Sequence, residues 1–466
     1  MARPLPLLPR LLLAALLAAG IAGCSSPYQK GLPPSMVGRP LPPGLQPLAD
    51  RMAADGERNW VLHLTTMAVA ALQFGDRETA KAALDEAILQ IEVIYGDSDQ
   101  ARRARSLFYS EGSKIYKGDP HERSMTYFYR GVLYMQEAEW DNARACFRSA
   151  LVMDSFAEDE QSQADWTTFH YLIGVCETQL RRPSHANDAF TLAANAFGAF
   201  PTRFQSVSKT PLPTDDEGLM PFTPESNLLI ISQSGRAPIK IGSGEFGERL
   251  SYRHGGAPDR LPVLEIDGKA LGAIQTVDSL FYQAVTRGGR ELDYILGKQA
   301  SFKGTTRDVG NVALVGGAVL LAEGLSSDND GMAAAGGALV AAGALSHGLS
   351  ALTRPRADTR SWRSIPEWIG LRPATVEPGV REVVIAHAMG TRVIARVDVP
   401  PPGKGLQVLL AFPPPHPFIL ANVEQSSPAD GPLEVDAPPP AIAASPPGEG
   451  PAPPAAVAES NPEPTP

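Results

Sequence analysis

Residues 127–150 decide the fold of this chain, and they read YFYRGVLYMQEAEWDNARACFRSA. Small and aromatic residues recur in this stretch at fixed offsets, which give Gly131, Tyr134, Ala143, Phe147 and Ala150. This spacing predicts two helices joined by a short turn, because residues three or four apart share one face of a helix. We expect these five residues to pack the two helices closely together.

The same register occurs once upstream and once downstream of this stretch. It gives Ala68, Ala80, Leu84 and Ala87 upstream, and Gly174, Ala186, Phe190 and Ala193 downstream. The pattern resembles the tetratricopeptide repeat, a helix–turn–helix unit of about 34 residues. Because the units here lie 63 and 43 residues apart, we expect an irregular array of such helices over residues 50–205. The usual concave peptide groove does not follow from it.

The pattern changes after residues 206–225, which are predicted to be a Pro-rich linker. Short apolar runs bounded by glycine or proline are typical of strands, and they occupy residues 227–232, 238–241, 262–266, 380–387, 391–399 and 405–412. Residues 275–300 regain helical spacing. The sequence therefore predicts a mainly α N-terminal domain followed by an α+β domain over residues 226–412.

A glycine-rich segment, residues 309–353, interrupts the α+β domain. Its two arms, 309–322 and 331–353, contain no Asp, Glu, Lys or Arg. Glycines recur every seven residues, at positions 310, 317 and 324 and again at 336 and 343, so each helical arm would carry a stripe that admits another backbone. We expect a helical hairpin that is buried on the sheet, associates with a second copy or touches a membrane.

An apolar run over residues 7–24, with arginines before and at its start, is typical of a signal peptide. The end of the run, Ile21–Cys24, reads IAGC and resembles the lipobox of bacterial lipoproteins; an ordinary secretory signal is the alternative. The resemblance implies that residues 1–23 are removed and that palmitate and further acyl chains on Cys24 attach the protein to a membrane.

Two features flank this lipidation site. Ser25 and Ser26 follow the cysteine where an Asp would favour the inner membrane, so the resemblance implies an outer-membrane lipoprotein that faces the periplasm. Residues 24–49 are rich in proline and are predicted to form a tether.

Charge is concentrated at the other end of the chain. Residues 413–466 are rich in proline and alanine and are predicted to be a disordered acidic tail. The formal net charge of the whole chain is −10. Nucleic acid is therefore not expected as a partner, because its binding depends on positive charge.

Few residues suggest chemistry. Asp358, Arg360 and Trp362 are a candidate cluster that either faces a ligand or anchors a loop through an ion pair and a buried ring. Cys146 and Cys176 are either two buried thiols or a disulfide. The glycines of 242–247 match a dinucleotide-binding fingerprint but are expected to form a loop between strands, since no long helix fits after them. No catalytic group, metal site or cofactor is predicted.

The whole arrangement resembles a group of uncharacterised bacterial lipoproteins with tetratricopeptide-like repeats and a C-terminal α+β domain. The turn Lys117–Pro120 ahead of the repeat, and Asp358, Arg360 and Trp362 ahead of the last strands, carry this resemblance. It implies the architecture of residues 24–412 and no activity.

The predicted function is a non-enzymatic, lipid-anchored envelope scaffold that binds partner proteins through its helical repeats, since stacked helix pairs expose broad surfaces. One alternative is a component of an export or pore-like assembly that forms a homo-oligomer through the glycine-rich hairpin. A second alternative is a periplasmic enzyme with a dispersed site. The expected partners are a membrane, through Cys24, and envelope proteins of unknown identity.

Overall fold

The computed structural model describes residues 28–95, 115–155, 165–212, 218–244, 247–256, 261–287, 311–315, 318–323, 325–327, 330–352, 357–387, 392–412, 418–420 and 422. The predicted signal peptide, Cys24 and residues 423–466 of the predicted tail lie outside this description. The described residues belong to one compact unit, Met1–Ala429.

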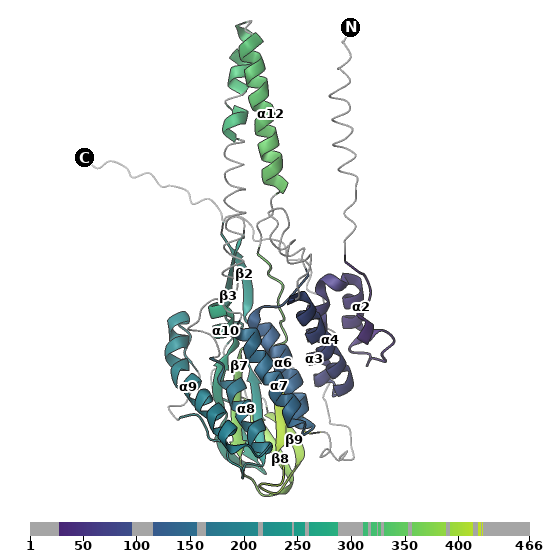
Figure 1. The fold of residues 1–466 in the computed structure, drawn as a ribbon, viewed down its shortest axis with the longest axis vertical. Helices are drawn as coiled ribbons and strands as arrows, with labels where there is room; N and C mark the ends of the chain where they lie inside the picture. Colours follow the sequence, from purple (N-terminus) through teal and green to yellow (C-terminus); the bar gives the residue numbers. More distant parts are fainter. Residues whose placement is uncertain are drawn as a thin grey trace, which may run out of the picture. The chain divides into compact units, whose positions relative to one another are not determined.

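The N-terminal region is helical, as the sequence predicts (Figure 1). Its elements are η1 (Pro34–Met36), α2 (Gln46–Asp55), η2 (Glu57–Asn59), α3 (Trp60–Gln73), α4 (Arg77–Tyr95), α6 (Pro120–Gln136), α7 (Trp140–Ser155), α8 (Thr167–Gln179) and α9 (Pro183–Val207). Consecutive helices form the pairs α3–α4, α6–α7 and α8–α9.

The three pairs have the same turn. The backbone at Gly75, Ala138 and Arg181 is left-handed, with φ of 73°, 58° and 57°. The next residue in each turn donates its N–H to a carbonyl five residues back, and all three hydrogen bonds, Asp76 to Ala71, Glu139 to Tyr134 and Arg182 to Glu177, measure 2.9 Å. This pattern closes the C-terminus of the first helix and starts the second.

Strands follow the helices in sequence. They are β1 (Leu228–Ser234), β2 (Ile239–Ser243), β3 (Arg249–Arg253), β4 (Val263–Ile266), β5 (Lys269–Ala273), β6 (Gln275–Ser279), β7 (Trp368–Ala374), β8 (Gly379–Ala386), β9 (Arg392–Val399), β10 (Gln407–Phe412) and β11 (Phe418–Leu420). A five-stranded sheet has the order β11-β10-β1-β7-β6, a four-stranded sheet has the order β5-β4-β8-β9, and β2 pairs with β3. Helices α10 (Leu280–Arg287) and α12 (Asp330–Leu352) lie between strands in sequence.

The five-stranded sheet is covered on both faces. Leu228 and Ile230 of β1 belong to a core shared with the four-stranded sheet. Leu229 and Ile231 point the other way, into a core that also holds helix residues from α3 to α9. This alternation explains why β1 reads as a continuous apolar run, which is typical of a strand buried on both faces.

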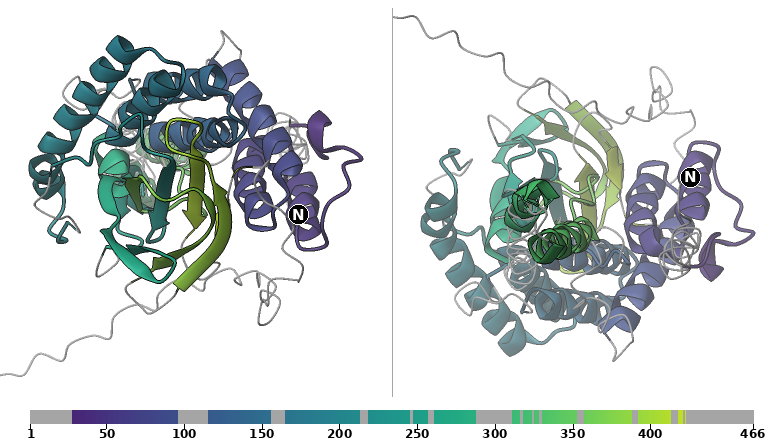
Figure 2. Two further views of the ribbon diagram at one scale, coloured as in Figure 1. Left: turned by 90° about the horizontal axis from the view of Figure 1, so that it is seen from below. Right: turned by 90° about the horizontal axis from the view of Figure 1, so that it is seen from above.

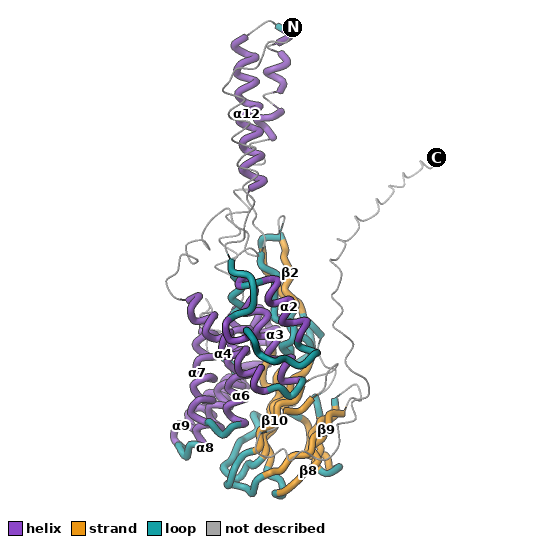
Figure 3. Tube along the Cα trace, turned by 90° about the vertical axis from the view of Figure 1, so that its right-hand side faces the viewer, coloured by secondary structure: helices purple, strands orange, loops and turns teal. Residues whose placement is uncertain are grey.

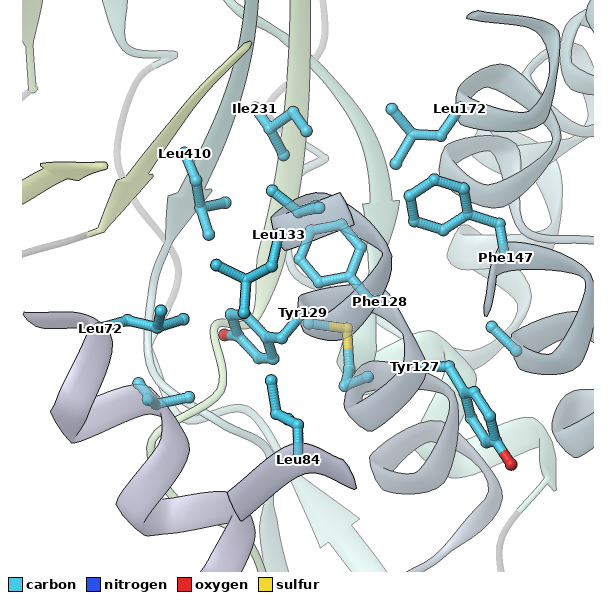
Figure 4. Close-up of a cluster of buried hydrophobic side chains, with 14 of the residues drawn as sticks. Leu72, Leu84, Tyr127, Phe128, Tyr129, Leu133, Phe147, Leu172, Ile231 and Leu410 are labelled. Carbon is cyan, nitrogen blue, oxygen red and sulfur yellow. The ribbon is translucent and has the colours of Figure 1, made fainter. Parts of the chain in front are cut away.

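The helices lie on one side of the strands (Figure 3) and curve around them (Figure 2). In the close-up of the shared core, Leu133 of α6 lies between Leu84 of the first pair and Ile231 and Leu410 of the sheet (Figure 4). One hydrophobic core therefore joins the helical and strand parts, so residues 50–205 and 226–412 are not separately packed domains.

Several boundaries differ from the sequence predictions. Residues 28–49 are not a free tether, because Met36 and Leu45 are buried in the main core. The predicted linker begins too early, since α9 continues to Val207. The tail also begins too early, because β11 pairs with β10 and Leu420 is buried. The proline-rich composition of these segments suggested extended chain, but apolar side chains within them pack in the hydrophobic core.

The predicted strands are all present, and further strands were missed. Residues 275–279, predicted to be helical, form β6, and the helix α10 starts only at Leu280. Strands β3, β5, β7 and β11 were not predicted. The glycines between β2 and β3 lie in a hairpin connection, so the dinucleotide-binding interpretation is excluded by the pairing of these two strands.

The glycine-rich segment is helical wherever it is described, most fully as α12. Among the α12 residues whose burial is described, only Gly336 and Gly343 are buried, as expected for a glycine stripe. Most other residues of α12 with described burial are exposed or half-buried, and Leu345 is 71% exposed, as is Val312 of the first arm at 75%. The prediction that this segment is buried on the sheet is therefore wrong for the described residues.

Candidate functional site

Helix α6 begins at the Lys117–Pro120 turn with two carboxylates. Pro120 takes the first helical position, where its missing N–H is not needed. Asp119 precedes it, and Glu122 reaches back so that its Oε2 accepts the backbone N–H of Asp119 at 2.7 Å. Both carboxylates therefore lie at the N-terminus of the helix, where the aligned peptide dipoles favour negative charge.

A buried lysine from β2 faces these carboxylates. Nζ of Lys240 is 2.9 Å from Oδ2 of Asp119 and 3.2 Å from Oε2 of Glu122, and the lysine side chain is 3% exposed. Burial lowers the pKa of Lys240, but Asp119 and Glu122 raise it above its ordinary value overall. Burial raises the pKa of Asp119, but Lys240 and His121 lower it below its ordinary value overall. The two groups are therefore held as an ion pair.

Two tyrosines complete the environment of the carboxylates. The hydroxyl of Tyr116 donates to Oε2 of Glu122 at 2.7 Å, and the hydroxyl of Tyr252, from β3, donates to Oδ2 of Asp119. Burial and the neighbouring carboxylates raise the pKa of Tyr116 well above its ordinary value. Tyr116 therefore stays neutral and acts as a hydrogen-bond donor.

The predicted cluster of Asp358, Arg360 and Trp362 lies beside this ion pair. Arg360 binds Asp358 through two nitrogens, with Nη2 at 2.6 Å from Oδ2 and Nε at 2.9 Å from Oδ1. Its Nη1 donates to Oδ1 of Asn59 at 2.7 Å, and its guanidinium lies 5.3 Å from the ring centre of Tyr116. The arginine therefore ties this segment to the N-terminal helices.

Trp362 is the buried end of the same segment. Its side chain is only 1% exposed, and its ring centre lies 5.7 Å from that of Tyr129 in α6. Its backbone N–H donates to Oε1 of Glu122 at 2.7 Å, and its indole N–H donates to Oγ of Ser364. These contacts are those expected if the cluster anchors a loop through an ion pair and a buried ring, and not if it faces a ligand.

We call Asp119, Glu122, Lys240, Tyr252 and Trp362 the junction. It joins three parts of the chain: the start of α6, the β2–β3 hairpin and the segment that precedes β7. Its charges are paired and hydrogen-bonded, so they can stay buried. Its chemistry is that of a structural attachment, because loss of one member would leave an uncompensated buried charge.

The sequence analysis found three residues of this region and missed the rest. Glu122 could have been found, because Asp119 and Glu122 stand at the spacing of a capping box just before an apolar pattern. Lys240 could have been suspected, because it is the charged residue within the apolar run Pro238–Ile241. Nothing in the sequence indicates that these two residues meet.

The predicted packing residues lie where two helices touch. A Cβ atom added to Gly131 would lie 2.6 Å from Cε1 of Phe147, so only glycine fits there. Gly174 and Phe190 repeat this arrangement in the next pair, also at 2.6 Å. Ala143 and Ala150 are fully buried, and Tyr134 carries the guanidinium of Arg130 at 3.7 Å from its ring centre.

A cleft of about 710 Å³ opens at the turn end of the helix pairs. It is lined by the start of α4, by the turns of the other two pairs, and by the connection from β9 to β10 and Asn422. Its charged lining residues are Arg77, Glu78, Lys81, Glu137, Arg181 and Lys404. The basic side chains outnumber the acidic ones, which favours an anionic ligand.

The two cysteines of the described region are free thiols. Burial raises the pKa of Cys146 to about 11, and burial also raises the pKa of Cys176. Both therefore stay protonated and unreactive at neutral pH.

Over the described ranges, no helix has the length and apolarity needed to cross a membrane. The same residues contain no cluster of His, Cys, Asp and Glu side chains that could hold a metal ion. No family model, curated protein or solved structure matches the chain.

Proposed function

We propose that the protein is a lipid-anchored scaffold of the bacterial envelope that binds a partner protein in the turn-end cleft. One observation carries this proposal: the start of α4, the turns of the other two helix pairs and the β9–β10 connection meet around one cleft. The cleft binds its partner by shape and charge, without catalysis. The anchor is Cys24, and its support is the resemblance of Ile21–Cys24 to a lipobox.

The chain's own strands pack against the inner face of the helices, so a partner protein cannot bind there. Gln136 of α6 donates to the carbonyls of Val408 and Leu420 at 3.0 and 2.8 Å. Thr168 of α8 donates its N–H to Asp278 of β6 at 2.7 Å. Since these strands take the place that a peptide takes in an open helical array, the turn end is the surface where a partner can meet all three pairs.

We further propose that the three helix pairs are irregular tetratricopeptide-like repeats. The support is one left-handed residue in each of the three turns, and a glycine that faces a phenylalanine in the last two pairs. The longer spacing between the first two pairs contains residues 96–114, which lie outside the described region.

The partner is expected to offer an acidic segment, because Arg77, Lys81, Arg181 and Lys404 outnumber the two glutamates of the cleft. A photo-reactive amino acid in place of Gln179, which lines the cleft, should capture an envelope protein in cells. In that background, the double change Arg181→Glu and Lys404→Glu should reduce capture about tenfold, because it reverses two charges that attract the partner.

The control for this experiment is Arg396→Glu, a charge reversal on the exposed face of β9. Capture should be unchanged in this variant. Capture that survives reversal of the cleft charges, or that falls equally in the control, would contradict the proposed binding surface.

A second candidate function is favoured by the exposed apolar side chains of the glycine-rich segment. Val312, Val315, Val319 and Leu325 are 64–75% exposed. A monomeric protein rarely leaves such a continuous apolar surface in water. We infer that a second copy of this chain covers it, as expected for a subunit of an export or pore-like assembly. Light scattering of the mature chain in mild detergent should give an oligomer, and a monomer would exclude this candidate.

A further inference from the structure

Ser208, His254 and Glu367 form a hydrogen-bonded triad that is separate from the junction contacts. Ser208 ends α9, His254 follows β3, and Glu367 precedes β7. Oγ of Ser208 lies 2.7 Å from Nε2 of His254, and Nδ1 of His254 bonds Oε1 of Glu367. A hydroxyl, an imidazole and a carboxylate in this order are the arrangement that activates a serine as a nucleophile.

The carboxylate of Glu367 is fixed in place. Its side chain is fully buried, and its Oε2 accepts the backbone N–H groups of Gly255 and Gly256 at 2.8 and 3.3 Å. Glycine is required at both positions, because Gly256 has a φ of +134° and a Cβ on Gly255 would collide with the carbonyls of Arg236 and Ala237. The chain therefore uses two consecutive glycines to bring N–H donors to one carboxylate oxygen.

Glu367 in turn sets the orientation of His254. With Nδ1 donating its proton to Glu367, Nε2 is left as an acceptor that faces Ser208. The imidazole also stacks on Phe281, with ring centres 3.6 Å apart. The ring is therefore held on one face by an aromatic side chain and at one edge by a carboxylate.

Ser208 is a partly exposed member of the three hydrogen-bonded residues. Its Oγ accepts the backbone N–H of Thr210 at 3.0 Å and lies within hydrogen-bond distance of Nε2 of His254. The N–H of Thr210 would stabilise negative charge that develops on this oxygen. A serine that only terminated α9 would need neither the histidine nor the buried carboxylate.

We propose that Ser208 is the nucleophile of an acyl-transfer site with His254 as general base and Glu367 as a positioning residue. Oγ of Ser208 attacks the carbonyl carbon of an ester, and its proton passes to Nε2 of His254. The C–O bond to the leaving group then breaks, and His254 gives that proton to the departing alcohol. Water attacks the acyl-serine with His254 again accepting a proton, which returns to Oγ of Ser208 as the carboxylic acid leaves.

The surroundings indicate the substrate class. An aromatic cluster packs at this place, made up of Phe200, Phe204, Phe281, Tyr282 and Trp368. The ring centre of His254 is 6.1 Å from that of Phe204. Such surroundings favour a carboxylic ester with a short apolar acyl group, because charged acyl groups would lose their hydration there. None of the three residues Ser208, His254 and Glu367 lines the turn-end cleft, so the test of this site is independent of the scaffold proposal.

The test is covalent labelling of the full mature chain with a fluorophosphonate, which reacts with activated serines. Trypsin releases residues 204–209 as one peptide that contains both Ser206 and Ser208. Fragment masses should place the phosphonate on Ser208, and Ser208→Ala should reduce the labelling rate about 100-fold or more. The matched control is Ser206→Ala, which changes an exposed serine two residues before Ser208. This variant should label like the parent chain.

Hydrolysis of p-nitrophenyl butyrate supplies a second measurement. Ser208→Ala should abolish it, and Glu367→Gln should lower kcat with little change in KM, while Glu367→Asp restores part of kcat. Absence of label on Ser208 in the folded parent chain would overturn the proposal, as would equal labelling of Ser208→Ala. If Ser208→Ala does not fold, the position of the label in the parent chain still decides.

Discussion

Helix α6 carries polar and charged side chains that are buried, whereas the far more apolar α12 lies mostly exposed. The buried polar residues of α6 are His121, Glu122, Arg123, Ser124, Thr126, Arg130 and Gln136. Helix α12 has Asp330 as its only acidic or basic residue apart from His347, yet only Gly336 and Gly343 are buried among its residues of described burial. Burial in this molecule therefore follows the neighbours of a helix and not its hydropathy.

Helix α6 can be buried because its polar groups find partners within the chain. Glu122 bonds Lys240, Oγ of Ser124 donates to the carbonyl of Ala150 at 2.8 Å, and Nε of Arg130 lies 2.7 Å from Oδ1 of Asp85. Buried polar groups cost little when each one is hydrogen-bonded. Helix α12 is mostly alanine, glycine and other apolar residues, so a second apolar surface is what would stabilise it by burial.

The largest effect is expected from breaking the junction. Glu122→Ala removes one partner of Lys240 and the acceptors of Tyr116 and Trp362. Because this leaves buried charge without compensation, the free energy of unfolding should fall by about 3–5 kcal/mol in urea titrations.

The matched control is Glu78→Ala in α4. Glu78 pairs with Lys81 at 3.0 Å, but its side chain is 78% exposed. An exposed ion pair contributes little, so this change should alter the free energy of unfolding by less than about 1 kcal/mol. Similar losses in the two variants would show that the junction is not held by buried charge.

Asp278 of β6 is another buried carboxylate, and it makes the stability depend on pH. It caps the start of α8 by accepting the N–H groups of Thr167 and Thr168 at 3.2 and 2.7 Å. Burial raises its pKa from 3.8 to about 7, against the lowering effect of these hydrogen bonds. The folded protein therefore holds this proton more tightly than the unfolded chain does between these two pH values.

Stability should consequently fall as the pH rises from about 4 to about 7, and stay level above that range. Between pH 5 and pH 8 the free energy of unfolding should decrease by about 2–3 kcal/mol from this group alone. Asp278→Asn keeps one acceptor oxygen at this site and should remove this part of the pH dependence. Parallel pH profiles for Asp278→Asn and the parent chain would contradict the assignment.

Two glycine substitutions compare α6 with α12 directly. Gly131→Ala places a methyl group against Phe147, so overpacking should lower the free energy of unfolding by about 1–3 kcal/mol. Gly337→Ala in α12 meets no atom within 4 Å and should be neutral or stabilise the helix by up to about 1 kcal/mol. Thermal unfolding followed by circular dichroism would separate the two, and a loss in both variants would place a hidden contact at Gly337.

The elements that sequence analysis predicted are those whose pattern is local. The helix pairs show in the spacing of Gly131 and Phe147, and β1 shows in a continuous apolar run. Strand β6 was missed because Val277, Leu280 and Phe281 have helical spacing, although Gln275–Ser279 pair with β7. Its strand conformation comes from a neighbour that lies about ninety residues further along the chain, and no local pattern carries that information.

The junction shows the same limit for side chains. Glu122 and Lys240 are 118 residues apart, and Glu122 and Trp362 are 240 residues apart. Each residue type is unremarkable by itself, so a single sequence indicates at most that Lys240 is a charge within an apolar strand. A single sequence also does not indicate that Ser208, His254 and Glu367 meet, because they lie in three separate parts of the chain.

The smallest effect on folding is expected in α12, where Leu345 is 71% exposed. Leu345→Ser removes little buried area, so the free energy of unfolding of the monomer should change by less than about 0.5 kcal/mol. If a second copy covers this helix, the same change should instead weaken association, because buried apolar area contributes about 25 cal/mol per Å² to such contacts. Light scattering across a dilution series measures this.

The comparison then depends on one control, Leu133→Ser in α6. Leu133 is 1% exposed and packs in the main core, so its replacement should cost about 2–5 kcal/mol of unfolding free energy. Loss of assembly in Leu345→Ser without loss of stability, and the reverse in Leu133→Ser, would show that the apolar residues of the two helices serve different contacts. Equal stability losses in both would mean that α12 is already covered within its own chain, and the proposed second copy would have no surface to bind.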